Sequence, residues 1–600
     1  MIAPKKITIT VNGQICEGQQ GQTILEIARA NNIYIPTLCY LKGLTPWGGC
    51  RLCIVEVEGN PKLVPSCATP AVDGSKITTH NERIVAQRKA TLELLLSERN
   101  HICPICPYNK GDCGLQHQAI SHGITGIRYP YLYPALPVDV TGRYFGMDHN
   151  RCILCTRCVR TCDEIEGVHT LDVANRGIKS QIVVDMNTTF GASDTCTQCG
   201  ACVVNCPTGA LFDKAAAFRG QWTSCQQVYT TCTECPVGCG LMVHTKENRI
   251  VNVWGDPNSP VNTGHLCVKG RYQIWAEPRE RITTPLIHGQ PATWDEALAT
   301  IAQAAKAKKE EKALLVAPRL TNETAAAVAR VANTVGQVAM FVGTNEAALC
   351  ADPSFSEEAL RKLQDADAII LLGVQPSRDH GVVAARIRVA VRKRGAKLLI
   401  FHARKSDLDA YADVAANVVS LESKLWNKVK AVLAGSQRPA LLYGPHAMTP
   451  IGVTVMERLI GILEANPGGE PLLLGLPISP AALAMSKAGI PAVEEVGPWL
   501  DAKSLKYLHI VVGDAPDGGA SLLEEKYVPA LLGQIACVVV QASYRSALTE
   551  KAHVVLPSTL WCEKSGTITN VEGRCLPLRP VVPVAGEARD DQAILERVFA

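Results

Sequence analysis

Apolar and polar residues alternate at the start of the chain, and a helical period follows. The run KITITV at 6–11 and the run IVEV at 54–57 alternate as strands do. Between them, residues 23–31 have the apolar spacing of a helix, and residues 81–99, NERIVAQRKATLELLLSER, keep that spacing over a longer stretch. The pattern predicts short strands around one helix, followed by a longer helix.

The second half of the chain has a different pattern. After about residue 281, Ala-rich helical stretches alternate with the apolar strands KALLVAP, AIILLG, KLLIFHA, PALLYG and HIVVGDAP. This alternation predicts a mostly parallel α/β sheet. Residues 114–150 are rich in Gly, Pro and Tyr and are expected to be ordered coil.

These changes of pattern divide the chain into several domains, since 600 residues exceed a single hydrophobic core. The predicted class is multi-domain α+β. The predicted boundaries are 1–79, 80–145, 146–220, 225–281 and 282–600.

Charge and hydropathy argue against two kinds of partner. The formal net charge of +4 is too small for this length to indicate nucleic acid or an anionic membrane surface. No apolar run reaches the roughly 18 residues of a spanning helix. The opening MIAPKKITITVNG has the pattern of neither a signal peptide nor a twin-arginine leader. We therefore expect a cytoplasmic chain with no direct membrane span.

Cysteines are concentrated in one part of the chain, because 21 of the 25 precede residue 270. In a reducing compartment they are expected to be metal or cluster ligands rather than disulfides. The first group, Cys39, Cys50, Cys53 and Cys67, is spaced C-x10-C-x2-C-x13-C, which suits a [2Fe–2S] centre whose irons take two thiolates each. A zinc site is the weaker alternative, because structural zinc usually has two short Cys pairs.

A four-cysteine pattern, C-x2-C-x2-C-x3-C, occurs twice: Cys152, Cys155, Cys158 and Cys162, then Cys196, Cys199, Cys202 and Cys206. In two-cluster ferredoxins the fourth cysteine of each run ligates the other cluster. Cys206 is therefore predicted to complete the [4Fe–4S] cluster of Cys152, Cys155 and Cys158. Cys162 would complete the cluster of Cys196, Cys199 and Cys202.

A further group, Cys232, Cys235, Cys239 and Cys267, supplies four thiolates for another [4Fe–4S] cluster. Lys269 follows the last ligand closely. It is expected either beside this cluster or as an ordinary solvated lysine.

The stretch ERNHICPICPYNKGDC at 98–113 contains Cys103, Cys106 and Cys113, one ligand short of a [4Fe–4S] cluster. Histidine can replace thiolate on iron, and a neutral imidazole raises the potential of the centre. With no spare cysteine nearby, His101 is predicted as the fourth ligand, and a lone surface histidine is the alternative. The cysteines left unassigned are expected to be small buried apolar residues rather than ligands: Cys16, Cys225, Cys350, Cys537, Cys562 and Cys575.

In this order, the cysteine groups resemble the large peripheral iron–sulfur subunit of complex I and its relatives. These relatives are hydrogenase diaphorase subunits, iron-only hydrogenases and the alpha subunit of NAD-dependent formate dehydrogenases. The spelling ERNHICPIC is most similar to the hydrogenase diaphorase subunit, although the gap from Cys106 to Cys113 is one residue longer than the family spacing. The implied order is a β-grasp [2Fe–2S] domain, a one-His/three-Cys segment and a two-cluster ferredoxin-like domain.

From Cys232 onward, the chain resembles molybdopterin oxidoreductases, through segments at 283–298, 373–381, 395–406 and 550–574. The pterin itself is not expected. His402, Ala403 and Arg404 stand where catalytic relatives carry Asp-Pro-Arg, and SLESKL at 420–425 replaces their Pro-Gly-Thr-Asp loop. No Cys-His pair occurs, and the chain ends soon after Arg574, so we expect an α/β scaffold without the C-terminal barrel. No Gly-x-Gly-x-x-Gly turn indicates a nicotinamide or flavin site.

The predicted function is that of an electron-relay subunit in an NAD(P)H-linked oxidoreductase, with one [2Fe–2S] and four [4Fe–4S] clusters and no active site of its own. The resemblance implies a flavin/NAD(P)H-binding subunit and a small thioredoxin-like [2Fe–2S] subunit as partners, and ferredoxin if the assembly bifurcates electrons. Two alternatives stay open. A catalytic formate dehydrogenase would contain molybdenum or tungsten, and a structural assembly subunit would carry clusters that NADH does not reduce.

Overall fold

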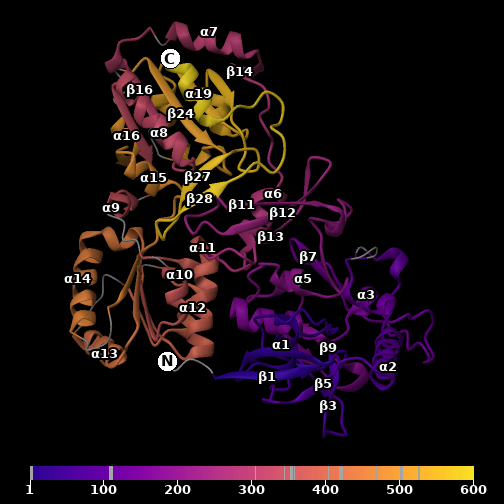
Figure 1. Ribbon diagram of the computed structural model, residues 1–600. Coiled ribbons are helices and arrows are strands. Elements are labelled where there is room, and N and C mark those ends of the chain that lie inside the picture. The colour runs from indigo at the N-terminus through magenta and orange to yellow at the C-terminus, as the bar shows by residue number, and fades with distance from the viewer. Residues whose placement is uncertain are drawn as a thin grey trace. The chain divides into compact units, whose positions relative to one another are not determined.

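The computed structural model describes residues 5–600, apart from residues 107, 109–111, 305, 344, 352–355, 357, 403, 418–422, 466–469, 501–504 and 525–527. The chain forms two compact units, Met1–Cys225 and Gln226–Ala600 (Figure 1). Among the described residues, no helix combines the length and the apolar character needed to cross a bilayer.

The first unit begins with a five-stranded sheet in the order β2-β1-β5-β3-β4. Its strands are β1 Lys6–Val11, β2 Gln14–Gln19, β3 Ile54–Val57, β4 Val64–Pro65 and β5 Lys76–Thr78. Helix α1, Ile24–Ala30, starts with a capping box between Thr23 and Glu26, and it buries Leu25 and Ile27 against the sheet. The two strands and the helix predicted in this region are confirmed.

Two helices follow. Helix α2 spans Glu82–Glu98 with Asn81 as its N-cap, which confirms the predicted long helix. The expectation of coil over 114–150 is wrong for Gly114–Ser121, which forms helix α3, and for two short strands at Val138–Asp139 and Phe145–Asp148. The Cys113 sulfur caps this helix by accepting a hydrogen bond from the Gln116 amide at 3.5 Å. Cysteine is not among the residues that normally signal a helix start, so the sequence pattern missed it.

Short elements surround the two cysteine runs. A three-stranded sheet has the order β10-β7-β6, and β8 pairs with β9. Their bounds are β6 Val138–Asp139, β7 Phe145–Asp148, β8 Leu171–Ala174, β9 Gln181–Val184 and β10 Leu211–Asp213. Each run leads into a short helix, α4 Arg157–Thr161 or α5 Ala201–Asn205, through one left-handed residue, Thr156 or Gly200. The two runs therefore share a local structure as well as a spacing.

The second unit begins with an antiparallel sheet of β11 Gln226–Thr231, β12 Gly240–Lys246 and β13 Arg249–Gly255. An eight-stranded sheet follows in the order β15-β14-β26-β25-β24-β16-β17-β23, and a five-stranded sheet in the order β20-β19-β18-β21-β22. The eight strands are β14 Leu286–Ile287, β15 Gln290–Pro291, β16 Lys312–Val316, β17 Gln337–Phe341, β23 Ala492–Val493, β24 Tyr507–Gly513, β25 Cys537–Ala542 and β26 Val554–Pro557. The five strands are β18 Ala368–Leu372, β19 Lys397–Phe401, β20 Val414–Ala416, β21 Pro439–Tyr443 and β22 Leu472–Gly475, and β27 Gly566–Thr569 pairs with β28 Cys575–Leu578.

Helices cover both faces of these sheets. The helices of this unit are α6 Ile274–Ala276, α7 Trp294–Ala304, α8 Asn322–Val331, α9 Glu346–Ala351, α10 Ala359–Gln364, α11 Pro376–Asp379, α12 Gly381–Arg394, α13 Ser423–Leu433, α14 Pro450–Glu464, α15 Ala482–Lys487, α16 Val496–Trp499, α17 Val528–Leu532, α18 Ala547–Lys551 and α19 Asp591–Val598. On the five-stranded sheet, α12 lies on one face and α13 and α14 on the other (Figure 1).

The five apolar segments singled out in the sequence become β16, β18, β19, β21 and β24, and each has parallel neighbours. The predicted parallel α/β architecture is therefore confirmed. The structure divides these strands between two sheets. The sequence pattern did not predict this division, because strand pairing depends on contacts between segments far apart in the chain, and the period of a single strand carries no information about them.

Candidate iron–sulfur cluster sites

Cys39, Cys50, Cys53 and Cys67 come together beside the first sheet, and all four are buried. Hydrogen bonds from the side chains of Cys50 and Cys67 lower the pKa of the Cys39 thiol, and the Cys67 side chain does the same for Cys53. The loop that carries the first three passes through a left-handed Gly48, with φ of +66°. Four mutually interacting buried thiols form a donor set that suits a binuclear iron centre.

The two ferredoxin-type runs line two separate cavities. Cys152, Cys155, Cys158 and Cys206 line a cavity with about 310 Å³ of empty volume, walled by Met147, Ile182 and Leu211. Cys196, Cys199, Cys202 and Cys162 line another of about 330 Å³, walled by Phe145, Phe190 and Leu171. The fourth cysteine of each run thus lies with the first three of the other run.

Burial makes these thiols poor acids in the absence of iron. It raises the pKa of Cys152 and Cys155 to about 12. Coordination to iron removes the thiol proton and supplies the countercharge that the apolar walls do not. Both cavities therefore fit an iron–sulfur cluster.

His101 is half-buried, but its Nε2 is buried and has no hydrogen-bond partner among the described residues. Burial lowers the pKa of His101 to about 4, and a hydrogen bond to the backbone of Leu95 opposes this. A neutral imidazole anchored to the backbone, with one free ring nitrogen, has the form of a metal-ligating histidine. These features disfavour the alternative, in which His101 is a solvated surface histidine.

The three cysteines that follow His101 lie close to one another. Burial raises the pKa of Cys113 to about 11, and the nearby Cys106 and Cys103 add to this effect. Cys103 is exposed, and Cys106 is half-buried. The loop between Cys106 and Cys113 lies largely outside the described residues. The Gly114 amide donates to the Pro207 carbonyl at 2.7 Å, so this segment is joined to the one that carries Cys206.

Gly209 leaves room for the Cys106 sulfur, because a Cβ on Gly209 would lie 2.7 Å from that atom. A free Cys106 could rotate away, but one held on a cluster could not. Gly209→Ala should therefore lower the iron content of the purified chain by up to one [4Fe–4S] cluster. Gly126→Ala, where a Cβ meets nothing within 4 Å, is the matched control. Equal iron content in both variants would show that Cys106 is not held in place.

Cys232, Cys235 and Cys239 are buried in the core of the second unit, and Cys267 packs against them. The Cys232 amide donates to the Cys239 carbonyl at 2.8 Å. Lys269 lies near Cys235 and donates to the Asp379 carbonyl at 3.4 Å. The structure therefore favours a Lys269 beside the cysteines over an ordinary solvated lysine.

Buried arginines around the first two cysteine sets were missed by the sequence analysis. Arg88, Arg99 and Arg160 are each less than 10% exposed, and Arg157 is half-buried. Each donates to a backbone carbonyl: Ile54, Ser180, Cys39 and Tyr40, respectively. None forms an ion pair with a described acidic residue. The only sequence signal was the presence of Arg157 and Arg160 inside the run RCILCTRCVRTC.

Family models cover most of the chain. A 2Fe-2S iron-sulfur cluster binding domain matches residues 4–82, the NADH-ubiquinone oxidoreductase-G iron-sulfur binding region matches 88–128, and the ferredoxin-like domain of NADH-quinone oxidoreductase subunit 3 matches 142–212. The molybdopterin oxidoreductase Fe4S4 domain matches 225–274, and the molybdopterin oxidoreductase model matches 281–449 and 524–600.

Curated relatives match over nearly the whole chain. The NADPH-Fe(3+) oxidoreductase subunit alpha of Geobacter sulfurreducens is 27% identical over 99% of this chain and 81% of its own length. The mitochondrial NADH-ubiquinone oxidoreductase 78 kDa subunit of Candida albicans is 27% identical over 98% and 82%. This chain is therefore similar, over nearly its whole length, to the large, 78 kDa-type iron–sulfur subunits of NADH-quinone oxidoreductases. Among solved structures, a chain of an NAD+-reducing [NiFe]-hydrogenase is 36% identical over 36% of this chain and 91% of its own, with a TM-score of 0.34.

This similarity confirms the resemblance drawn from the cysteine groups. It also confirms the fold at the level of an N-terminal [2Fe–2S] domain, further iron–sulfur domains and a molybdopterin-oxidoreductase-like domain. The last of these raises the question of a pterin cofactor.

Charged side chains gather at the C-terminal edge of the eight-stranded sheet, where α/β folds bind ligands and where a pterin would be held. Arg319 and Asp514 follow the adjacent parallel strands β16 and β24. Arg319 pairs with Glu234 at 2.5 Å and with Asp514 at 3.7 Å. Lys564 lies 3.6 Å from Asp514 and 2.8 Å from Asp591.

These five side chains form one continuous ion network in which both cations already have carboxylate partners. Asp514, Lys564 and Asp591 are buried, and Arg319 and Glu234 are half-buried. The adjoining cavity has only about 330 Å³ of empty volume, and its walls include Leu320, Trp561 and Ile568. An anionic dinucleotide pterin would find neither a free cation nor sufficient space here. The residues present do not fit the pterin. His402, at the other departure from the catalytic pattern, is bonded to Asp409 at 3.0 Å, while Ala403 and 420–422 lie outside the described residues.

The ion network should contribute strongly to stability. Burial opposes the charged form of Lys564, but Asp514 and Asp591 more than offset this and raise its pKa. Lys564→Met leaves the buried Asp591 carboxylate without a cation and should destabilise the fold by about 3–5 kcal/mol. Arg330→Met, which removes an exposed pair with Glu596, should cost about 0–1 kcal/mol. Calorimetric unfolding of the two variants under anaerobic conditions tests this, and equal losses would contradict it.

Proposed function

We propose that this chain is the iron–sulfur relay subunit of an NAD(P)H-linked oxidoreductase complex. It would carry one [2Fe–2S] cluster and four [4Fe–4S] clusters on the five ligand sets described above, and it would pass single electrons between a flavin/NAD(P)H-binding subunit and a second redox site. The curated relatives named above are subunits of an NADPH-Fe(3+) oxidoreductase and of an NADH-ubiquinone oxidoreductase, which supports this role.

One observation carries the proposal: three of the ligand sets meet in a single apolar core. That core contains Cys39 and Cys50 of the first set and Cys155 of the ferredoxin-type pair, and Cys113 of the His101 set packs against it. Electron transfer between clusters is fast only over short distances through packed protein. A shared core provides such contact, whereas independent structural metal sites would not need it.

Hydride chemistry would take place on partner subunits. A flavin subunit would accept two electrons from NAD(P)H and pass them on one at a time. A small thioredoxin-like [2Fe–2S] subunit and ferredoxin are further proposed partners. The 282–600 region would serve as a scaffold without pterin, and its lack of a barrel stays a prediction. A cytoplasmic location without direct membrane contact is part of the same proposal.

The proposal can be tested by anaerobic purification of the chain with its co-purifying subunits. We expect iron and sulfide for one binuclear and four cubane clusters, no molybdenum or tungsten, and EPR signals that NADH or NADPH reduces only when the flavin subunit is present. Bound molybdenum or tungsten would favour a catalytic formate dehydrogenase. Clusters that stay oxidised with the flavin subunit and NAD(P)H would favour a structural assembly subunit.

A further inference from the structure

Arg160 lies on α4 between two of the ligand sets and touches a residue of each. Its Nη2 donates to the Cys39 carbonyl at 2.6 Å and to the Cys155 carbonyl at 3.2 Å. Its Nη1 donates to the Thr45 carbonyl at 2.7 Å, and its Nε donates to the Thr156 hydroxyl at 3.2 Å. One guanidinium therefore links the backbone of the [2Fe–2S] loop to that of the Cys152 set.

All of these acceptors are neutral, although Arg160 is a buried cation. Glu164, one turn further along, accepts a hydrogen bond from the Thr45 amide at 2.7 Å rather than from Arg160. A buried charge without an opposite charge is costly, usually by several kcal/mol. The nearby thiols of both sets can carry that opposite charge once iron is bound, because four thiolates and the bridging sulfides outweigh the charge of the irons.

Arg157, on the same helix, supports this explanation. It donates to the Tyr40 carbonyl at 2.7 Å, and its Nε has no partner in the described part of the chain. Burial lowers its pKa, while Cys155 and Cys206 of one set and Cys39 and Cys50 of the other oppose that effect. Both arginines thus lie within electrostatic reach of two sites that would be anionic.

We propose that Arg160 couples the [2Fe–2S] centre to the cluster of Cys152, Cys155, Cys158 and Cys206, as their shared countercharge and as the hydrogen-bonded bridge between them. This inference rests on the proposed function. In the step concerned, one electron leaves the reduced binuclear centre and enters the oxidised cubane. No bond forms or breaks, and no proton moves. Its positive charge stabilises the reduced, more negative state of either cluster, so it raises both potentials.

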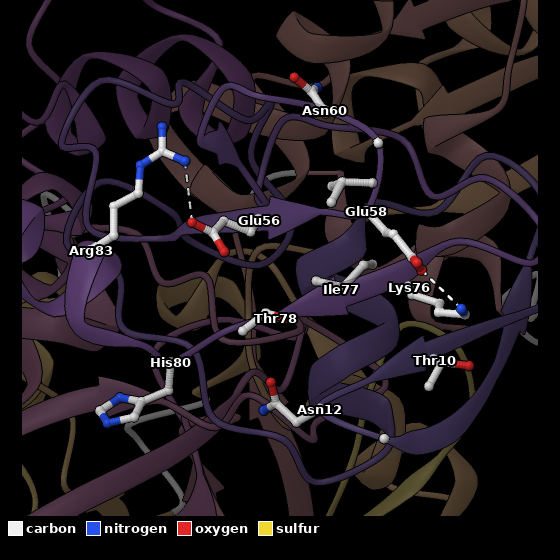
Figure 2. A pocket seen from close by; sticks show the side chains of 13 residues that line it. Thr10, Asn12, Glu56, Glu58, Asn60, Lys76, Ile77, Thr78, His80 and Arg83 are labelled. Carbon is white, nitrogen blue, oxygen red and sulfur yellow. Dashed lines mark hydrogen bonds and ion pairs between the residues drawn. The ribbon is translucent and has the colours of Figure 1, made fainter.

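The test is an EPR-monitored redox titration of both clusters in the full chain. Arg160→Gln should lower both midpoint potentials, and the shift should persist at high salt because the charge is buried. The matched control is Arg83→Gln in the same unit. Arg83 is 57% exposed and pairs with Glu56 at 3.3 Å at the edge of an open pocket (Figure 2), so its smaller effect should vanish with added salt.

Arg160→Lys separates the two roles. Lysine keeps the charge but has one ammonium nitrogen where Arg160 uses two guanidinium nitrogens for the three carbonyls. Both potentials should therefore stay near those of the unmodified chain, while electron transfer from the binuclear centre to the cubane slows in rapid-mixing experiments. If Arg160→Gln loses a cluster, the transfer rate and the two potentials of Arg160→Lys still test the role of Arg160.

The outcomes separate this inference from the proposed function. Two clusters with unchanged potentials in Arg160→Gln, or an unchanged transfer rate in Arg160→Lys, would overturn the role of Arg160 and leave the relay intact. Absence of either cluster from the unmodified chain would overturn the ligand sets themselves.

Discussion

The His101→Ala variant is expected to lack one [4Fe–4S] cluster. The buried Nε2 of His101 has no protein partner among the described residues, and its removal leaves three cysteines for a cubane that needs four ligands. Cys103 is exposed, so solvent would reach the open iron and promote loss of the cluster. Iron and sulfide analysis should show that loss, together with the disappearance of one EPR signal.

His101→Cys should restore the cluster with a lower midpoint potential, because thiolate is negatively charged where imidazole is neutral. His117→Ala is the control, since His117 is exposed on helix α3 in the same segment. If His101→Ala kept its full iron content and an unchanged EPR spectrum, His101 would not be a ligand.

The second large effect is expected at the crossed cysteines of the ferredoxin-type region. Cys206→Ser should lose the same cluster as Cys155→Ser, because both cysteines line one cavity. Cys162→Ser should lose the same cluster as Cys199→Ser, because these line the other. EPR spectra of the four variants would show which signal disappears in each.

Of the unassigned cysteines, Cys16, Cys537 and Cys562 are buried as expected, whereas Cys225 is half-buried and Cys575 is exposed, so the expectation of burial is wrong for these two. Cys225→Ser, in the same unit as the ferredoxin-type runs, should leave both signals in place. The opposite pairing, in which Cys162→Ser lost the same signal as Cys155→Ser, would mean that each run ligates its own cluster. The two ligand sets that line the cavities, each with one cysteine from the other run, would then be wrong.

Much of this chain could be predicted from its sequence because the relevant information is local. Strand and helix periods identified β1, β3, α1 and α2, since the side chains that set each period lie within one element. Cysteine spacing predicted groups that the structure brings together, since most members of each group lie within a few residues of one another. The missed helix α3 starts at Cys113, which is an unusual cap for a helix.

The His101 site shows where local information becomes insufficient. The spacing predicted His101 as the fourth ligand, but it left a surface histidine open as the alternative. The buried Nε2 and the bond to Leu95 distinguish the two, and both depend on how α2 packs. The Gly209 contact with Cys106 is likewise invisible in the sequence, because the two residues are far apart along it.

By itself, the sequence determined the elements, the grouping of the cysteines and the iron–sulfur family, because period and ligand spacing are properties of short segments. The tertiary structure alone decided that Arg160 joins Cys39 to Cys155, and that Arg319 and Lys564 are neutralised by Glu234, Asp514 and Asp591. These charges meet only when distant segments pack together. Their energetic effect depends on burial, which removes the water that would otherwise screen them.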